Sequence, residues 1–193
     1  LMEKGDYKAI TDLVNLLRTD GLIIHVNPMQ EWLQPEGDRL NHSPIDIITE
    51  VLQNVDFPII VKEVGQGFGR ESIRQIMKLP LEAVEFAAFG GTNFAKMEMM
   101  RNLENNKELY EPLSYIGHTA EDMVNILNKA THDNSEFKTN QVIISGGIRN
   151  FLDGYYLMRK SEVPAIYGMA STFLQYAKED YQALEDFAHN QIK

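Results

Sequence analysis

Six potential ligands follow a short apolar run near the start of the chain. The run Leu22 to Ile24 has β character, and polar residues come directly after it: His25, Asn27, Gln30, Glu31, Glu36 and Asp38. Parallel α/β enzymes build their active sites at the C-terminal ends of buried strands. A strand that only packed in a core would need no such cluster. We therefore interpret residues 22–39 as the centre of a candidate active site.

Glu31 is the strongest candidate for a metal ligand in this cluster. Mg²⁺ prefers oxygen ligands and keeps several waters, so a carboxylate on an oxygen-rich loop suits it. The alternative is a solvated loop acid. The neighbouring Gln30 does not titrate near neutral pH and could hydrogen-bond or orient a substrate. It could equally be an ordinary surface glutamine.

His25 and Asn27 stand between the apolar run and the Gln30–Glu31 pair. The imidazole of His25 could contact an anionic substrate or transfer a proton, or it could be a core histidine with satisfied hydrogen bonds. Asn27 could bind a ligand, or it could order the loop through its own backbone, as asparagine before proline often does.

Lys62 is unusual because it follows the apolar run Pro58 to Val61, which predicts a buried strand. A buried lysine is unfavourable unless it is paired, and strand alternation directs Glu63 to the opposite face. We therefore expect an anion beside Lys62. A cofactor phosphate or a flavin carbonyl would serve, and an ion pair with a core carboxylate is the structural alternative.

Three glycine-containing turns follow the later predicted strands: Gly90-Gly91-Thr92, Ser145-Gly146-Gly147 and Gly168-Met169-Ala170. Unhindered backbone amides at such places suit phosphate binding at a loop or at a helix N-terminus. Tight turns between strands and helices also use glycine, so each turn alone is a weak signal.

Strands and helices alternate along the sequence. Strands are predicted at 21–26, 58–64, 83–88, 141–145 and 163–167, and helices at 8–18, 44–55, 70–78, 119–130, 149–160 and 170–192. Residues 27–43 are predicted as a long polar loop, and 95–117 as an irregular insertion. This α/β order predicts one parallel sheet with right-handed crossovers in a single domain, residues 1–193. An open sheet is possible, but glycines after the last strands favour strands 4 to 8 of a (β/α)8 TIM barrel whose N-terminal strands are missing.

The bulk properties exclude several classes of protein. The 193 residues suffice for one α/β domain, and the net charge of −10 argues against a nucleic-acid partner. The chain has no cysteine, which excludes a thiol nucleophile and fits a cytoplasmic protein. No apolar run approaches the ~20 residues of a membrane span, and residues 1–20 show no signal-peptide pattern.

Taken together, these residues resemble the type 2, FMN-dependent isopentenyl-diphosphate δ-isomerases. Four segments carry the resemblance: His25 to Asp38, Pro58 to Gly65, Phe89 to Ala95, and Ser145 to Asn150. The first is the most specific, whereas the others also occur in looser form among flavin-binding barrels. The match follows the chain in order and corresponds to the C-terminal part of the family's barrel.

The resemblance implies an enzyme that interconverts isopentenyl diphosphate and dimethylallyl diphosphate with reduced FMN, NADPH to reduce it, and Mg²⁺. It also implies a homo-oligomer, a tetramer or larger. Gln30 matches the catalytic glutamine beside the flavin, and Glu31 matches the Mg²⁺ ligand. The remaining matches are substrate contacts at His25 and Asn27, FMN contacts at Lys62 and Thr92, and phosphate-binding turns at Gly146, Gly147, Gly168, Met169 and Ala170.

The sequence also departs from the family's pattern. Ala87 stands where members more often carry a hydroxyl, Gln66 replaces an expected aromatic residue, and Ile116-Gly117 replaces an expected Trp-Gly.

Two alternatives remain open at this point. Another FMN-binding TIM-barrel oxidoreductase, such as a hydroxy-acid oxidase or dehydrogenase, would use a histidine–arginine pair late in the barrel, but Arg149 has no histidine near it in sequence. A non-catalytic barrel fragment that binds a partner or stabilises an oligomer is favoured by the missing strands. The Gln30–Glu31 pair argues against that second alternative.

Overall fold

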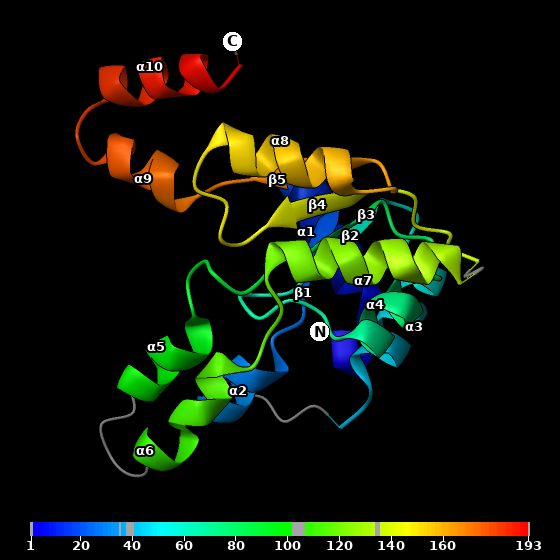
Figure 1. Cartoon of the computed structure of the whole chain (residues 1–193). Coiled ribbons are helices and arrows are strands. Elements are labelled where there is room, and N and C mark those ends of the chain that lie inside the picture. The colour runs from blue at the N-terminus through cyan, green and yellow to red at the C-terminus, as the bar shows by residue number, and fades with distance from the viewer. Residues whose placement is uncertain (1, 35, 38–40, 102–106, 134–135, 193) are drawn as a thin grey trace.

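Strands and helices alternate along the described part of the chain (Figure 1). The computed structural model describes residues 2–34, 36–37, 41–101, 107–133 and 136–192. In chain order the elements are η1 (Met2–Lys4), α1 (Tyr7–Leu17), β1 (Leu22–His25), α2 (Pro28–Leu33), α3 (Pro44–Asn54), β2 (Ile59–Lys62), α4 (Arg70–Ile76), β3 (Ala83–Glu85), α5 (Phe94–Arg101), α6 (Lys107–Tyr110), η2 (Glu111–Tyr115), α7 (Ala120–His132), β4 (Val142–Ser145), α8 (Phe151–Lys160), β5 (Ala165–Gly168), α9 (Ser171–Ala177) and α10 (Tyr181–Ile192).

The five strands form one parallel sheet in the order β1-β2-β3-β4-β5. This confirms the predicted α/β class and the predicted parallel pairing. The strand order follows the chain order throughout, without the reversal at which doubly wound sheets bind their ligands. All five carboxyl ends therefore lie along one edge of the sheet, and the loops that follow the strands gather there.

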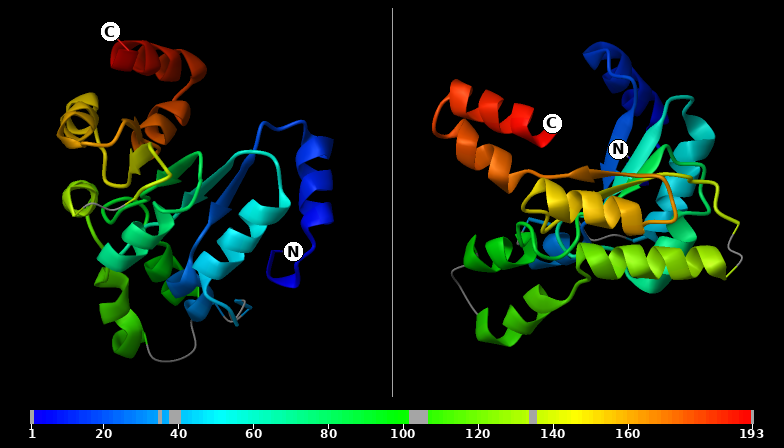
Figure 2. Two further views of the ribbon diagram at one scale, coloured as in Figure 1. Left: turned by 90° about the vertical axis from the view of Figure 1, so that its right-hand side faces the viewer. Right: turned by 45° about the horizontal axis from the view of Figure 1, so that its top comes forward.

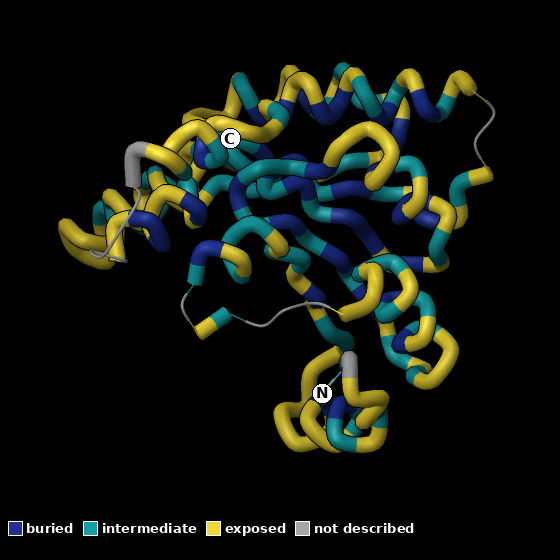
Figure 3. Tube along the Cα trace, turned by 90° about the horizontal axis from the view of Figure 1, so that it is seen from below, coloured by how far each residue is buried: buried dark blue, intermediate teal, exposed yellow. Residues whose placement is uncertain are grey.

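One face of the sheet is covered by helices. The register row Ile24, Val61, Val84 and Val142 is buried on this face. These side chains share one core with apolar residues of α3, α4, α7 and α8, among them Val51, Ile73, Leu127 and Leu157. In Figure 2 these helices follow one another along one side of the strands, and Figure 3 shows the buried strand positions at the centre of the molecule.

The opposite face of the sheet is open. Register places His25, Lys62, Glu85, Ile143 and Ile166 in one row across the five strands. At the outer strands the open face is strongly exposed, because Ile23 is 54% and Ile166 is 61% accessible. Apolar side chains at both outer strands therefore face away from the helical layer without cover from the described residues.

The two segments that were predicted to be irregular contain short helices, so those two predictions were wrong. Residues 27–43 hold α2, which begins with Pro28 in a favourable first-turn position. Residues 95–117 are largely covered by α5, α6 and η2. The helix α2 packs on α5 through Leu33, Ala95 and Met99. Helices this short carry too few residues to show an apolar period in the sequence.

The single long helix predicted for residues 170–192 is in fact two helices, α9 and α10. The Asp180 carboxylate accepts a hydrogen bond of 2.8 Å from the Ala183 amide, so it starts a new helix at this point. The pair folds back on itself, with Tyr176 stacked on Phe187 at 4.3 Å between ring centroids. None of the helices in the described residues is long and apolar enough to cross a membrane.

The other helices and the strands lie where the sequence predicted them, with shifted ends. Strand β3, for example, ends at Glu85 rather than at residue 88. Thr119 and Asp122 form a reciprocal capping box at the start of α7.

We expect the shared core to dominate the stability of the protein. Leu127 of α7 is fully buried in it, so Leu127→Ala should lower the free energy of unfolding by about 2–5 kcal/mol. Leu152 of α8 is 64% exposed, and Leu152→Ala should change the same quantity by less than about 0.5 kcal/mol. Urea denaturation of both variants measures the difference; equal effects would mean that the helical layer does not form this core.

Candidate functional site

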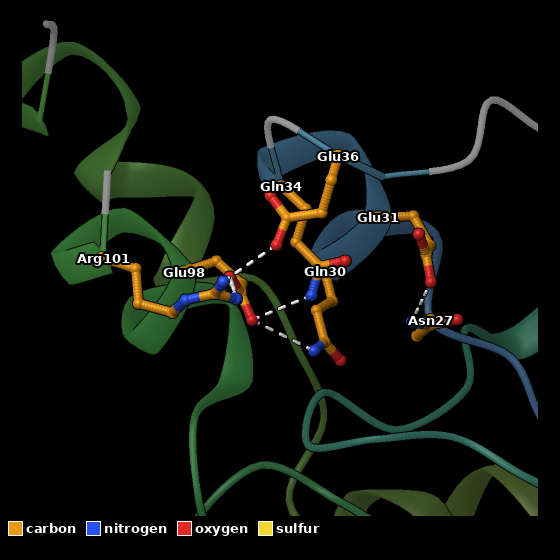
Figure 4. A network of polar contacts seen from close by, with 7 residues as sticks. All are labelled: Asn27, Gln30, Glu31, Gln34, Glu36, Glu98 and Arg101. Carbon is orange, nitrogen blue, oxygen red and sulfur yellow. Dashed lines mark hydrogen bonds and ion pairs between the residues drawn. The ribbon is translucent and has the colours of Figure 1, made fainter. Parts of the chain in front are cut away.

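Gln30 of α2 and Gln34, the residue that caps the C-terminal end of α2, reach the same carboxylate on α5. Gln30 donates from Nε2 to Glu98 Oε1 at 3.2 Å, and Gln34 donates from its own Nε2 to the same oxygen at 2.9 Å (Figure 4). The two residues are one helical turn apart, so their side chains leave α2 on the same face. Glu98 is only 4% exposed. The predicted catalytic glutamine is thus held by a buried acid from a distant part of the chain.

Arg101 completes the surroundings of this carboxylate. It donates from Nη1 to Glu98 Oε2 at 2.6 Å and from Nη2 to Glu36 Oε1 at 2.8 Å. A buried carboxylate is tolerated only when it is paired and hydrogen-bonded, and Glu98 meets both conditions. Sequence reasoning missed Glu98 because its segment was predicted to be irregular. The only local signal is the spacing of Glu98 and Arg101, three residues apart on one helix.

Glu31 and Gln30 have different hydrogen-bond partners. Asn27 Nδ2 donates to Glu31 Oε1 at 2.8 Å (Figure 4). Within the residues that the structure describes, no group of three or more histidine, cysteine or acidic side chains could hold a metal ion. Asp38, the other carboxylate of the predicted ligand cluster, lies outside the described residues. A lone carboxylate still fits Mg²⁺, which proteins often bind through one or two carboxylates plus substrate phosphates.

His25 and Lys62 are brought together at the ends of adjacent strands. The two residues are paired in register on the open face. His25 is exposed, so the alternative of a core histidine was wrong. Lys62 is half-buried and donates from Nζ to the Glu63 carbonyl at 2.8 Å. Its register neighbour Glu85 accepts a hydrogen bond from Ser145 Oγ at 2.8 Å, and these two described residues, Lys62 and Glu85, form no ion pair with each other.

The glycine turns after β3 and β4 pack against each other. Gly146 has φ +92°, and a side chain there would clash with the backbone of Ala88. A Cβ on Gly147 would lie 3.4 Å from the Gly90 Cα. Close packing therefore explains both glycine pairs in structural terms, and phosphate binding by Gly146 and Gly147 stays a prediction.

The remaining predicted cofactor residues lie at the same edge of the sheet. Thr92 is exposed, and its carbonyl oxygen would be 2.5 Å from a Cβ on Gly65. Gly168 ends β5 in register with Ser145, Met169 packs against the core, and Ala170 is exposed before α9. The predicted site thus consists of a group at the strand ends and a group on α2, which holds Gln30 and Glu31.

Ala87 adopts a left-handed backbone conformation with φ +42°. Its amide donates to Ser145 Oγ at 3.0 Å. The hydroxyl that the resemblance led us to expect at position 87 is absent, but the neighbouring strand brings a hydroxyl to this place. Sequence alone gave no sign of the strained backbone.

Glu63 is a second buried acid that sequence reasoning did not use. It is 7% exposed, and its Oε2 accepts hydrogen bonds from the amides of Gly65, Gln66 and Gly67 at 2.7, 2.6 and 2.9 Å. Burial raises the pKa of the Glu63 carboxyl above its ordinary value, although these backbone hydrogen bonds oppose the rise. The carboxylate thereby fixes the loop that follows β2.

A mainly apolar cavity of about 690 Å³ lies beside this loop, within the range of small-molecule sites. Its lining includes Met29 and Trp32 of α2, residues 66 and 67, and residues 113 and 116–118. Gln66 Nε2 donates to the Ile116 carbonyl at 2.7 Å, so two of the departures from the family's pattern contact each other in this wall.

Comparison with known proteins shows which sequences the chain is similar to. No family model matches the chain. The chain is similar to proteins named isopentenyl-diphosphate delta-isomerase: 32% identical over 86% of its length to that of Rickettsia bellii, and 33% over 90% to that of Nostoc sp.. The matched regions make up 46% and 48% of those relatives. The chain thus spans about half the length of the curated relatives it matches.

The raised pKa of Glu63 makes its contribution to stability depend on pH. A carboxyl with a raised folded-state pKa stabilises the fold when protonated, and this contribution is lost as pH rises through the folded-state pKa. Glu63→Gln cannot ionise yet keeps an acceptor oxygen for the loop amides. We therefore expect the stability of Glu63→Gln, relative to the unmodified protein, to improve as pH rises from acid to neutral.

Urea denaturation at a series of pH values tests this expectation. Glu179→Gln, at an exposed position, serves as the control and should show no such trend. A difference that stays constant with pH for Glu63→Gln would contradict the raised pKa.

Proposed function

We propose that the chain is part of an FMN-dependent, type 2 isopentenyl-diphosphate δ-isomerase, acting in the cytoplasm. In this proposal it interconverts isopentenyl diphosphate and dimethylallyl diphosphate with reduced FMN and Mg²⁺, and NADPH supplies the reducing equivalents. The observation that carries the proposal is the α2 group, in which Gln30 is held by Glu98 and lies next to Glu31. The names of the relatives give independent support for the isomerase activity.

The sheet fits strands 4 to 8 of a (β/α)8 barrel in this proposal. Its strands follow chain order and carry helices on one face, as in a barrel wall. Apolar side chains are exposed at both edges, including Leu16 and Ile23 near β1 and Ile166 on β5. The relatives are about twice as long as the matched region, which leaves room for further strands. The same proposal includes a homo-oligomer of the whole protein, a tetramer or larger.

Glu31 is the residue we assign to Mg²⁺. Glu31 lies in the first turn of α2, and its carboxylate accepts a hydrogen bond from the Asn27 side chain. A metal at this place would neutralise the substrate diphosphate and fix its position. His25, exposed at the end of β1, and Asn27 would contribute further polar contacts to the substrate.

The open face of the sheet is where we place FMN. Lys62 fits the group because its ammonium lies on this face and has a neutral carbonyl acceptor rather than a carboxylate. Thr92, Gly146, Gly147, Gly168, Met169 and Ala170 lie along the carboxyl edge next to it. When bound, reduced FMN would supply the acid/base group for a double-bond shift that involves no net oxidation or reduction.

The chain's own residues would bind, orient and shield the substrate. Proton addition and removal on a short prenyl group need the reacting carbons held in one geometry and kept from water. Gln30 suits the orienting role because its amide keeps the same charge over the whole working pH range. The apolar cavity beside α2 suits the prenyl group.

The metal assignment predicts a selective loss of activity. Glu31→Gln should lower isomerase turnover at least about 100-fold by removing the carboxylate that holds Mg²⁺, whereas FMN affinity should stay unchanged. The exposed Glu179→Gln serves as the matched control and should keep full activity. Simultaneous loss of FMN binding in Glu31→Gln would show that Glu31 belongs elsewhere.

Turnover is measured on the chain alone and on the chain mixed with the unmatched part of the Rickettsia bellii relative. The substrate is isopentenyl diphosphate, with reduced FMN and Mg²⁺ present. Absence of turnover in both samples would contradict the proposed activity.

The cofactor assignment predicts saturable FMN binding that depends on Lys62. Lys62→Ala should weaken FMN binding about tenfold or more, since hydrogen bonds to charged groups contribute about 1.5–3 kcal/mol. Lys178→Ala, at an exposed position, should leave the affinity unchanged. Flavin fluorescence during titration measures both; equal affinities in the two variants would contradict the role of Lys62.

A further inference from the structure

The terminal amide of a glutamine has two chemically different ends, and Glu98 distinguishes them. An ionised carboxylate only accepts hydrogen bonds, so it selects the amide nitrogen. Gln30 Nε2 lies 3.2 Å from Glu98 Oε1. The carbonyl oxygen of Gln30 must then point away from α5. Figure 4 shows the amide of Gln30 oriented in this way.

We propose that Arg101 is a positioning residue for Gln30, acting through Glu98 so that the Gln30 carbonyl oxygen is presented to the substrate. This inference rests on the proposed function, in which Gln30 contacts the substrate. Arg101 itself touches neither Gln30 nor the reacting atoms. It holds the carboxylate that decides which end of the Gln30 amide faces outward.

Arg101 is suited to this role by its two ion pairs. One guanidinium nitrogen holds Glu98 at 2.6 Å, and the other holds Glu36 at 2.8 Å. The Glu98 side chain is 6% exposed, whereas that of Arg101 is 58% exposed. The Glu98 carboxylate therefore loses more of its contact with water than the Arg101 guanidinium does. Without Arg101, the side-chain amides of Gln30 and Gln34 would be the side-chain donors left to Glu98 among the described residues, and rotation of the carboxylate toward water would become more favourable.

The same carboxylate also fixes the helix that carries Gln30. Helix α2 has six residues, too few for stability in isolation. Gln34, at the C-terminal cap of α2, donates to Glu98 at 2.9 Å, and Leu33 packs on Ala95 and Met99. Arg101 extends the attachment to Glu36, just beyond α2. The orientation of Gln30 thus depends on a clamp with Glu98 at its centre and Arg101 holding it in place.

Nuclear magnetic resonance of the chain labelled with ¹⁵N-glutamine tests the clamp without any cofactor or substrate. The side-chain amide signals of Gln30 and Gln34 are assigned from Gln30→Ala and Gln34→Ala. In the unmodified chain we expect both pairs of signals to be shifted from free-amide values and protected from exchange with water. Arg101→Met should return them toward free-amide positions, and Arg101→Lys should restore them in part.

Arg159→Met, on the exposed surface of α8, is the matched control and should leave these signals unchanged. Unchanged Gln30 signals in Arg101→Met would overturn the inference. So would an equal loss in Arg159→Met.

A double-mutant cycle on isomerase turnover separates positioning from a purely structural role. Arg101→Met should lower kcat about tenfold with a smaller change in KM. In a Gln30→Ala background the same substitution should add little, because its effect passes through Gln30. Independent, multiplicative losses would overturn the inference. If the unmodified chain shows no turnover, either alone or mixed with the unmatched part of the Rickettsia bellii relative, the proposed function fails, while the amide signals still decide whether Arg101 orients Gln30.

Discussion

Parallel pairing of neighbouring strands is the constraint on which the rest of this molecule depends. Each parallel pair requires a crossover from one end of the sheet to the other, and here the main crossover helices cover the same face. The carboxyl ends consequently line one edge, where His25 pairs in register with Lys62, and Ser145 with Gly168. The loops that follow the strands are therefore neighbours as a direct result of the parallel pairing.

A second constraint acts at the layer beyond the strand ends. Glu98 is a buried acid, and burying a charge requires donors around it. Gln30, Gln34 and Arg101 supply them from two short helices. Because neither helix is stable by its length, the polar group and the small apolar contact beside it hold α2 in place. An arrangement of this kind couples the position of Gln30 to the Glu98–Arg101 ion pair.

Glu63, in the loop after β2, is also a buried acid, but its hydrogen-bond donors are backbone amides instead of side chains. Three successive amides surround its carboxylate, so the loop can turn sharply beside an apolar cavity. The raised pKa of the Glu63 carboxyl shows that burial outweighs these donors. The glycine turns after β3 and β4 also shape this edge of the sheet, because their two backbones approach each other more closely than side chains would permit.

The sequence by itself determined the α/β class, the five strands and most of the helices, because apolar periods and turn residues are local signals. It also singled out Gln30 and Glu31 in the polar segment after the first predicted strand, and Lys62 within the second. Only the tertiary structure decided that the 170–192 region breaks at Asp180, that α2 and α5 are helices, and that Glu98 holds Gln30. Gln30 and Glu98 are 68 residues apart in the chain. No local pattern encodes which distant donor satisfies a buried acid, because that choice depends on how the packed elements bring side chains together.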